Sequence, residues 1–259
     1  MRRAIHCAPL TFFASTLLAQ DPLVVAPSAY KVAFENQYVQ IVRVHYGPKE
    51  RIAPHDHTPL STAYVYLNDS GPVVFDHIGA DYSAITRSPT QAKAFRIYYG
   101  LPEVHAVVNT SDLPSDFLRV QFKTRPKNDT TFKGKFPALT YPPAENFEKV
   151  QVDHDQARIT RLAIAPGKRM EIVAQADAPA LLIAVTNLDV VMASKSAEAA
   201  NATKTMVKGQ PGADIWIDPG GHKGLENHGS LPAEFLRFDL KTPPMSADEL
   251  AKKGVPHAR

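Results

Sequence analysis

Residues 109–119 read NTSDLPSDFLR, and residues 227–237 read NHGSLPAEFLR. The two stretches lie 118 residues apart, and both keep Leu-Pro and Phe-Leu-Arg at the same places. Three upstream residues match at the same separation, namely Ile41, Arg43 and Pro48 with Ile159, Arg161 and Pro166. Distant blocks that share one separation indicate an internal duplication, with one domain at about 30–124 and its copy at about 146–242.

Short alternating runs between turns predict that each copy is all-β. The run at 38–48 (YVQIVRVHYGP) is rich in β-branched residues and ends at a Gly-Pro turn. The 22 prolines in 259 residues argue against long helices and for many turns. We therefore expect sandwiches or barrels built from short strands, the first copy using residues 20–33, 38–48, 63–67, 73–75, 94–99 and 117–122.

The N-terminus resembles an export signal. Met1-Arg2-Arg3 precedes a mostly apolar run that ends at Leu18, which is typical of a secretory signal peptide cleaved after Ala19. The run is too short and too interrupted for a membrane span, and the alternative is a disordered N-terminus without a targeting role. The expected organisation is a signal peptide at 1–19, an N-terminal domain at 20–124, a proline-rich linker at 125–145, a C-terminal domain at 146–242 and a tail at 243–259.

Composition limits the partners of the protein. Cleavage would leave 27 basic and 26 acidic residues, so the net charge of +3 would fall to +1. This near-neutral balance gives no electrostatic reason to expect a nucleic acid or an anionic membrane as partner. The single cysteine, Cys7, would leave with the signal, which excludes disulfides, thiolate metal sites and a cysteine nucleophile. We expect a secreted or periplasmic protein whose partner is a small molecule.

The stretch Pro54-His55-Asp56-His57 is the best candidate for a functional site. On a strand, the side chains of residues i and i+2 point to the same face, so His55 and His57 could chelate one divalent cation. His105 is the best candidate for a third imidazole. A histidine pair of this kind is otherwise a surface or hydrogen-bonded feature, and this alternative stays open.

The duplication provides an internal comparison for this site. At the common separation His55 corresponds to Val173 and His57 to Gln175, while His105 corresponds to His222 with a shift of one residue. Valine cannot ligate a metal and glutamine is a poor ligand, so the second copy is expected to be a metal-free structural partner. We expect His222 to be a hydrogen-bonded or ligand-facing group inside a barrel filled by Met170, Ile172, Leu182 and Ile183.

Other repeated or single residues are interpreted as structural. Four arginines persist in both copies and are expected to support the scaffold: Arg43, Arg161, Arg119 and Arg237. Five further histidines are expected to be surface or hydrogen-bonded groups: His45, His77, His154, His228 and His257. In the tail, Ser246 with Glu249 three residues later predicts one short capped helix that ends at Gly254.

Over about residues 30–242 the chain resembles a bicupin, a two-domain member of the cupin superfamily. The first cupin motif is matched by Gly47, His55, His57 and Gly71, but Ser61 or Thr62 stands where the motif has a glutamate. The second motif is matched by Pro102, His105 and Asn109 in the first copy, and by Pro219, Gly221, His222 and Asn227 in the second.

The resemblance implies two tandem double-stranded β-helix (cupin jelly-roll) barrels, with a metal inside the first. A neutral three-histidine site would accept iron, zinc, manganese, copper or nickel and leave positions open for water, dioxygen or substrate. Ser61 or Thr62 could then hydrogen-bond a metal-bound water. The implied function is dioxygenase-like or isomerase-like chemistry on a small organic molecule, with no catalytic residue assigned. The alternative is a non-catalytic cupin that binds a small ligand or serves structurally, and a homodimer stays open.

Overall fold

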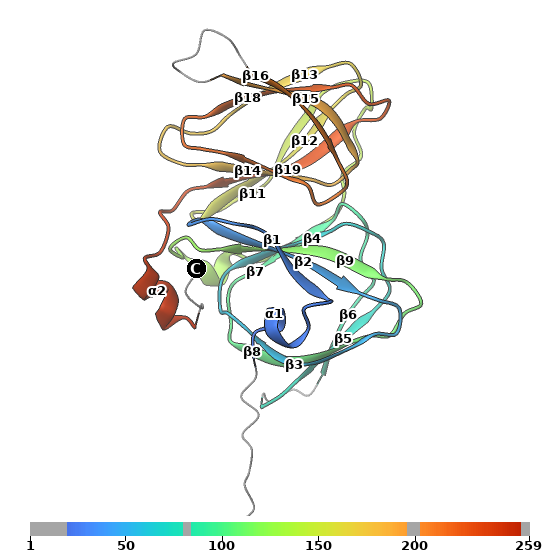
Figure 1. Cartoon of the computed structure of the whole chain (residues 1–259), viewed down its shortest axis with the longest axis vertical. Coiled ribbons are helices and arrows are strands. Elements are labelled where there is room, and N and C mark those ends of the chain that lie inside the picture. The colour runs from blue at the N-terminus through green and yellow to red at the C-terminus, as the bar shows by residue number, and fades with distance from the viewer. Residues whose placement is uncertain (1–19, 80–83, 196–202, 255–259) are drawn as a thin grey trace, which may run out of the picture.

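The computed structural model describes residues 20–79, 84–195 and 203–254. The signal peptide predicted at 1–19 and His257 lie outside these residues. The described chain is all-β, as predicted, with four antiparallel sheets and two short α-helices. Figure 1 shows the sheets as four stacked layers, with the second domain above the first. No helix in these ranges is long and apolar enough to cross a membrane.

The first domain contains two sheets that face each other. Its six-stranded sheet has the order β1-β2-β9-β4-β7-β10, and its four-stranded sheet has the order β3-β8-β5-β6. The strands are β1 (Tyr30–Glu35), β2 (Val39–Tyr46), β3 (Arg51–His57), β4 (Thr62–Tyr66), β5 (Val73–His77), β6 (Ala84–Arg87), β7 (Phe95–Tyr98), β8 (Glu103–Asn109), β9 (Ser115–Phe122) and β10 (Gly134–Phe136).

The second domain repeats this arrangement with sheets β11-β12-β19-β14-β17 and β13-β18-β15-β16. In the first domain Val42 lies opposite Arg119, and in the second Thr160 lies opposite Arg237, so the strand register keeps the separation of 118 residues. The strands are β11 (Phe147–Asp153), β12 (Ala157–Ile164), β13 (Arg169–Val173), β14 (Ala180–Ala184), β15 (Leu188–Lys195), β16 (Thr203–Gly209), β17 (Asp214–Ile217), β18 (His222–Asn227) and β19 (Ala233–Leu240).

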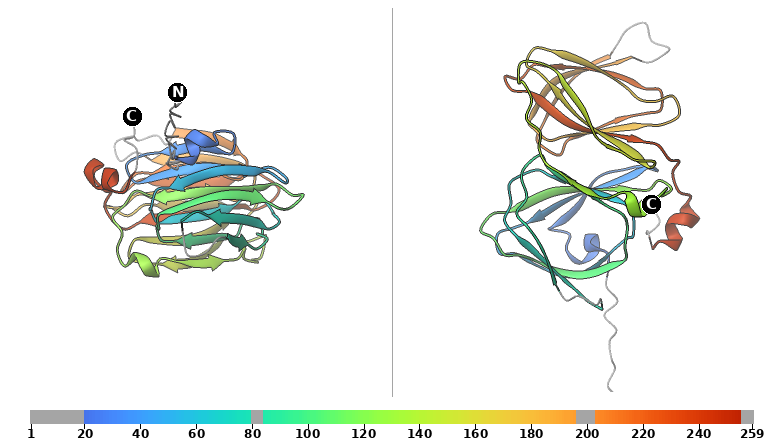
Figure 2. Two further views of the ribbon diagram at one scale, coloured as in Figure 1. Left: turned by 90° about the horizontal axis from the view of Figure 1, so that it is seen from below. Right: turned by 180° about the vertical axis from the view of Figure 1, so that it is seen from behind.

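The large sheets of the two domains pack against each other. Alternate residues of each strand point to opposite faces of its sheet. On β2, Ile41 therefore faces the second domain while Val42 and Val44 face the interior of the first barrel. The shared core joins residues such as Ile41 and Leu118 to Leu181 and others from the second domain. Figure 2 shows the same contact between the domains from behind.

Three segments differ from the simplest interpretation of the sequence. The segment 20–33 begins with helix α1 (Pro22–Val25), capped by Asp21, before β1. The predicted linker contains a 3₁₀ turn, η1 (Asp129–Thr131), and strand β10, which pairs with β7 and extends the first large sheet. Ile183, expected inside the second barrel, packs instead in the core between the domains, because it alternates with Leu182 on β14.

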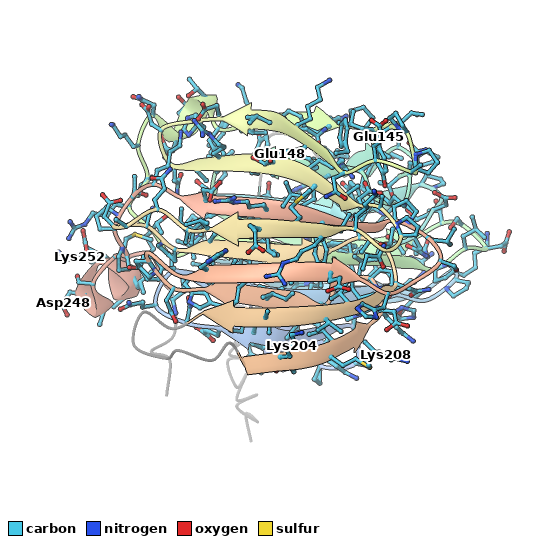
Figure 3. The ribbon with its side chains drawn as sticks, turned by 90° about the horizontal axis from the view of Figure 1, so that it is seen from above. Glu145, Glu148, Lys204, Lys208, Asp248 and Lys252 are labelled. Atoms are coloured by element: carbon cyan, nitrogen blue, oxygen red, sulfur yellow. The ribbon has the colours of Figure 1, made fainter. Side chains whose placement is uncertain are left out.

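Charged side chains lie on two edge strands of the second domain. Figure 3 shows Lys204 and Lys208 on the edge strand β16 and Glu148 on β11. Charged side chains on edge strands discourage pairing with other chains. The tail forms helix α2 (Ala247–Lys252) beside the first domain, with the predicted capping box of Ser246 and Glu249.

Candidate metal centre

Strand β3 carries a β-bulge immediately before its two histidines. Ile52 lies opposite Val107, and His55 lies opposite His105, so three steps along β3 match two steps along β8. The extra residue allows Ile52 and His55, which are three positions apart, to be buried on the same face. The bulge thus sets which face of the sheet the histidines occupy.

The structure brings the three predicted imidazoles together. One ring nitrogen from each of His55, His57 and His105 lies within 4.8 Å of the others. The Nε2 atoms of His57 and His105 are 3.1 Å apart, and His55 and His105 are buried. This convergence makes the group a candidate metal site, and metal binding by these three residues stays a prediction.

Hydrogen bonds fix the ring of His55 in a form suited to a ligand. Its Nδ1 donates to the carbonyl oxygen of Ala53, inside the bulge, at 2.8 Å. Nε2 of the neutral ring therefore keeps its lone pair and lies 3.1 Å from the hydroxyl of Tyr30. That hydroxyl is in turn 2.6 Å from the hydroxyl of Tyr46.

His57 has a different partner. Nη1 of Arg119 lies 2.6 Å from its Nδ1, and a guanidinium can only donate. The neutral His57 ring then carries its proton on Nε2, which points to Nε2 of His105. A neutral His57 could bind a cation through Nε2 only with its proton on Nδ1, so metal binding requires the contact between Nδ1 and Arg119 to be released.

All three histidines have pKa values below the usual value of 6.5. Burial is the main cause in each case, and the positive charge of Arg119 acts in the same direction. The pKa of His105 falls to about 2. The imidazoles are therefore neutral near pH 7, which is the form that binds metals.

Sequence reasoning missed two neighbours of His105. His77 lies directly opposite His105 on β5, and a carboxylate oxygen of Glu103 lies 3.8 Å from Nδ1 of His105. With His105 these two side chains form a second group of possible ligands within 4.8 Å. The spacing Glu103-Val104-His105 could have indicated a shared face, whereas the approach of His77 depends on the pairing of β5 with β8.

The candidate site opens on a cavity of about 560 Å³ between the two sheets of the first barrel. His57, His77, Glu103 and His105 lie on its wall. The expected role of Ser61 or Thr62 is not supported, since neither lines this cavity and the hydroxyl of Thr62 donates to the carbonyl of Leu60. Basic and aromatic residues complete the wall, among them Arg87, Arg96, Arg119, Tyr46, Tyr64, Tyr66 and Phe75.

The strand register corrects the residue correspondence in the second barrel. Strand β13 pairs with β18 without a bulge, so the counterparts of His55 and His57 are Ile172 and Ala174 rather than Val173 and Gln175. Both are buried in an apolar core. The counterpart of His105 is Lys223, which lies opposite Ile172 as His105 lies opposite His55.

His222 is hydrogen-bonded, as predicted, but it lies on the outer face of its sheet. It stands opposite the exposed Val173, and its Nε2 contacts a carboxylate oxygen of Glu171 at 2.5 Å. The one-residue error arose because an alignment by constant separation cannot represent a bulge present in only one copy. A metal-free second barrel stays a prediction.

The remaining repeated residues have mixed roles. Three of the single histidines make surface contacts, namely His45 with Asp116, His154 with Thr131 and His228 with Glu226. Three of the repeated arginines support the scaffold: Arg43 donates to the carbonyl of Pro211, Arg161 pairs with Glu234, and Arg237 pairs with Asp239. Arg119 differs from these three because it contacts His57 and lines the cavity, and its role as a scaffold residue stays a prediction.

No protein-family model and no curated protein matches the sequence. Solved structures match over most of the chain. The oxalate decarboxylase of Lactobacillus farciminis, in a formate complex, is 12% identical with a TM-score of 0.56, covering 86% of this chain and 87% of the other. AerE of Microcystis aeruginosa is 12% identical with a TM-score of 0.53, covering 82% and 97%.

A third match is a Bacillus subtilis oxalate decarboxylase studied for its Mn(II) centres. It is 11% identical with a TM-score of 0.52, covering 84% of this chain and 77% of the other. Such low identities establish similarity of fold alone. The chain therefore shares the two-barrel fold of these proteins, and its first barrel holds a three-histidine candidate metal site.

Proposed function

We propose that the first barrel holds a divalent transition metal at His55, His57 and His105 and acts there on a small organic molecule. The observation that carries the proposal is the convergence of three imidazoles, two of which, His57 and His105, line a cavity of about 560 Å³. A metal in this position would supply a Lewis acid or an activator of dioxygen, consistent with dioxygenase-like or isomerase-like chemistry.

The residues of the chain would position the ligands and the substrate. The carbonyl of Ala53 orients His55 with Nε2 free to bind a metal, and Arg119 is the neighbour of His57 that would have to shift when His57 binds through Nε2. Groups beyond the ligands tune metal affinity through such contacts. The aromatic rings of Tyr64, Tyr66 and Phe75 on the wall provide an apolar surface for an organic substrate.

Metal content tests the proposal directly. Protein loaded with Mn(II), Fe(II), Zn(II), Cu(II) or Ni(II) and then dialysed is expected to keep one equivalent, measured by elemental analysis. His57→Ala should lose it, because two imidazoles rarely retain a transition metal against buffer. His45→Ala is the matched control, since His45 is exposed and contacts Asp116. Equal retention by both variants would refute the site.

A second candidate function is binding without catalysis. It is favoured by the missing glutamate after His57 and by the apolar residues Ile172 and Ala174 at the corresponding positions of the second barrel. Oxygen uptake by metal-loaded protein with phenolic or dicarboxylic compounds distinguishes an enzyme from a binding protein. Turnover that His57→Ala abolishes supports an enzyme, and tight binding without turnover supports the binding protein.

We also propose that the protein is secreted or periplasmic and that its partner is a small molecule. The support is the signal-like segment Met1–Leu18 and the near-neutral charge that remains after Ala19. N-terminal sequencing of the protein from its natural host should begin at Gln20, and a retained Met1 would refute export with cleavage.

A further inference from the structure

We infer that the ligand of the first barrel is an organic dianion with two separated acidic groups, bound between Arg119 and Arg96. The inference rests on the proposed function because it places this ligand in the cavity beside the candidate metal site. The inference concerns arginines rather than the three histidines, so the inference and the proposed metal site can fail separately.

The cavity has a strong excess of positive charge. Among the described residues that line it, Arg87, Arg96, Arg119 and Lys135 are basic, and only Glu103 is acidic. A bound divalent cation would increase this excess. A cavity of this kind concentrates anions and stabilises them in a medium of low dielectric constant.

The guanidinium groups in the cavity form no direct ion pair in the described part of the chain, although Glu103 interacts with Arg96 through its charge. The arginines that form ion pairs there are Arg125, Arg158, Arg161, Arg169 and Arg237. Arg119 is 5% exposed, and the Nε atoms of Arg87, Arg96 and Arg119 are buried without a hydrogen-bond partner among the described residues. Buried positive charge that a single carboxylate compensates only in part is costly, so these groups indicate an anion supplied from outside the chain.

The second barrel serves as an internal control. There Arg237, the counterpart of Arg119, pairs with Asp239 at 2.7 Å, and the first barrel has the neutral Gln121 at the position of Asp239. The register places the apolar residues Ile215 and Val207 where the first barrel has Arg96 and Arg87. The unpaired positive charge is thus specific to the first cavity and is not required by the fold.

The spacing of the arginines argues for two separated acidic groups. Arg96 lies opposite Tyr64, and Tyr64 lies opposite Arg119, in one row across β7, β4 and β9. Two strand spacings put the two arginine Cα atoms about 10 Å apart. Arg119 contacts His57 beside the candidate metal site, while Arg96 stacks on Tyr64 at 4.3 Å. A linear diacid of four to six carbons, whose carboxylates are not adjacent as they are in oxalate, is the ligand class that we assign to this pair of arginines.

Arg87 has a different role. It donates to the hydroxyls of Ser70 and Ser115 and lies over the rings of Tyr66 and Phe117. These contacts hold it in the wall, so it contributes positive charge to the cavity while Arg96 and Arg119 make the direct contacts.

Calorimetric titration of the metal-treated full protein tests the inference. The probes are succinate, glutarate, adipate and oxalate, with succinamate and adipate monoamide as matched half-amides. At least one of the four- to six-carbon diacids is expected to bind about 10- to 100-fold more tightly than a half-amide, because one charge-assisted contact is lost with the amide. Oxalate, whose two carboxylates are adjacent, should bind more weakly than that diacid.

Variants assign the preference to Arg96. Arg96→Gln should remove the preference for the diacid and leave half-amide binding unchanged. Arg96→Lys, which keeps the positive charge, should retain part of the preference for the diacid with the fold intact. Arg125→Gln, an exposed arginine paired with Glu249, should change nothing.

The inference is overturned if no diacid binds, if diacid and half-amide bind equally, or if the preference survives in Arg96→Gln. Metal content is measured on the same samples. A retained metal without diacid preference refutes only this inference, whereas a diacid preference without any retained metal refutes only the proposed metal site.

Discussion

Glu103 is the residue that most alters the expected chemistry of the site. The three-histidine site predicted from the sequence had no carboxylate, yet Glu103 lies 3.8 Å from Nδ1 of His105 and on the same wall. Nδ1 of His105 has no hydrogen-bond partner among the described residues, so Glu103 would act on a ligating His105 through its charge, which increases the basicity of the ring. Glu103, on β8, thus supplies near the candidate site the negative charge that the glutamate of the first cupin motif would have supplied after His57.

Glu103→Gln is expected to lower metal affinity by about 10-fold, because the neutral amide keeps the shape and loses the charge behind His105. Competition with a chelator of known affinity measures this. Glu226→Gln, which alters a surface contact with His228, is the control and should have no effect. An unchanged affinity in Glu103→Gln would show that the carboxylate does not act through His105.

At the scale of elements, the bulge in β3 distinguishes the two barrels. It adds one residue between Ile52 and His55 and aims the carbonyl of Ala53 at Nδ1 of His55. Strand β13 forms the same ladder without it. The bulge is therefore not needed to form the barrel, and its visible effect is on the orientation of His55.

Deletion of Ala53 should give a folded protein with weakened metal binding. The regular ladder of β13 shows that the barrel accommodates the shorter strand, and His55 would still face inward. Loss of the Ala53 carbonyl removes the contact that fixes the ring, so we expect about a 10-fold loss of affinity with an unchanged β-rich circular dichroism spectrum. Full metal affinity in the deletion variant would contradict this role of the bulge.

At the scale of the whole molecule, a buried ion pair joins the two domains. The side chains of Arg161 and Glu234 are 0% and 1% exposed and contact each other. Arg161 also donates to the carbonyl of Lys93 in the first domain, and the ammonium of Lys93 contacts Glu234 at 3.0 Å. The contact therefore depends on both domains and lies beside the apolar core between them.

Glu234→Gln should reduce the free energy of unfolding by about 3–5 kcal/mol, since it leaves Arg161 buried without its counterion. The double variant Arg161→Met, Glu234→Leu should recover much of this loss because it removes both charges. Asp153→Asn, at an exposed carboxylate that contacts Arg158 and Lys241, should have a much smaller effect, because solvent screens exposed ion pairs. Denaturant unfolding measures all three, and a loss as small for Glu234→Gln as for Asp153→Asn would refute the role of the buried pair.

The sequence by itself determined the duplicated all-β fold, the capped C-terminal helix and the three imidazoles of the candidate site. These features depend on local alternation, on turn residues and on a repeat of constant separation, all of which are present in the chain order. Only the tertiary structure decided that His77 and Glu103 join His105, and that Arg96 and Arg119 share a wall. The physical reason is that these contacts depend on which strands pair and in what register. One bulge, invisible in the residue pattern, shifted the correspondence of His55 from Val173 to Ile172.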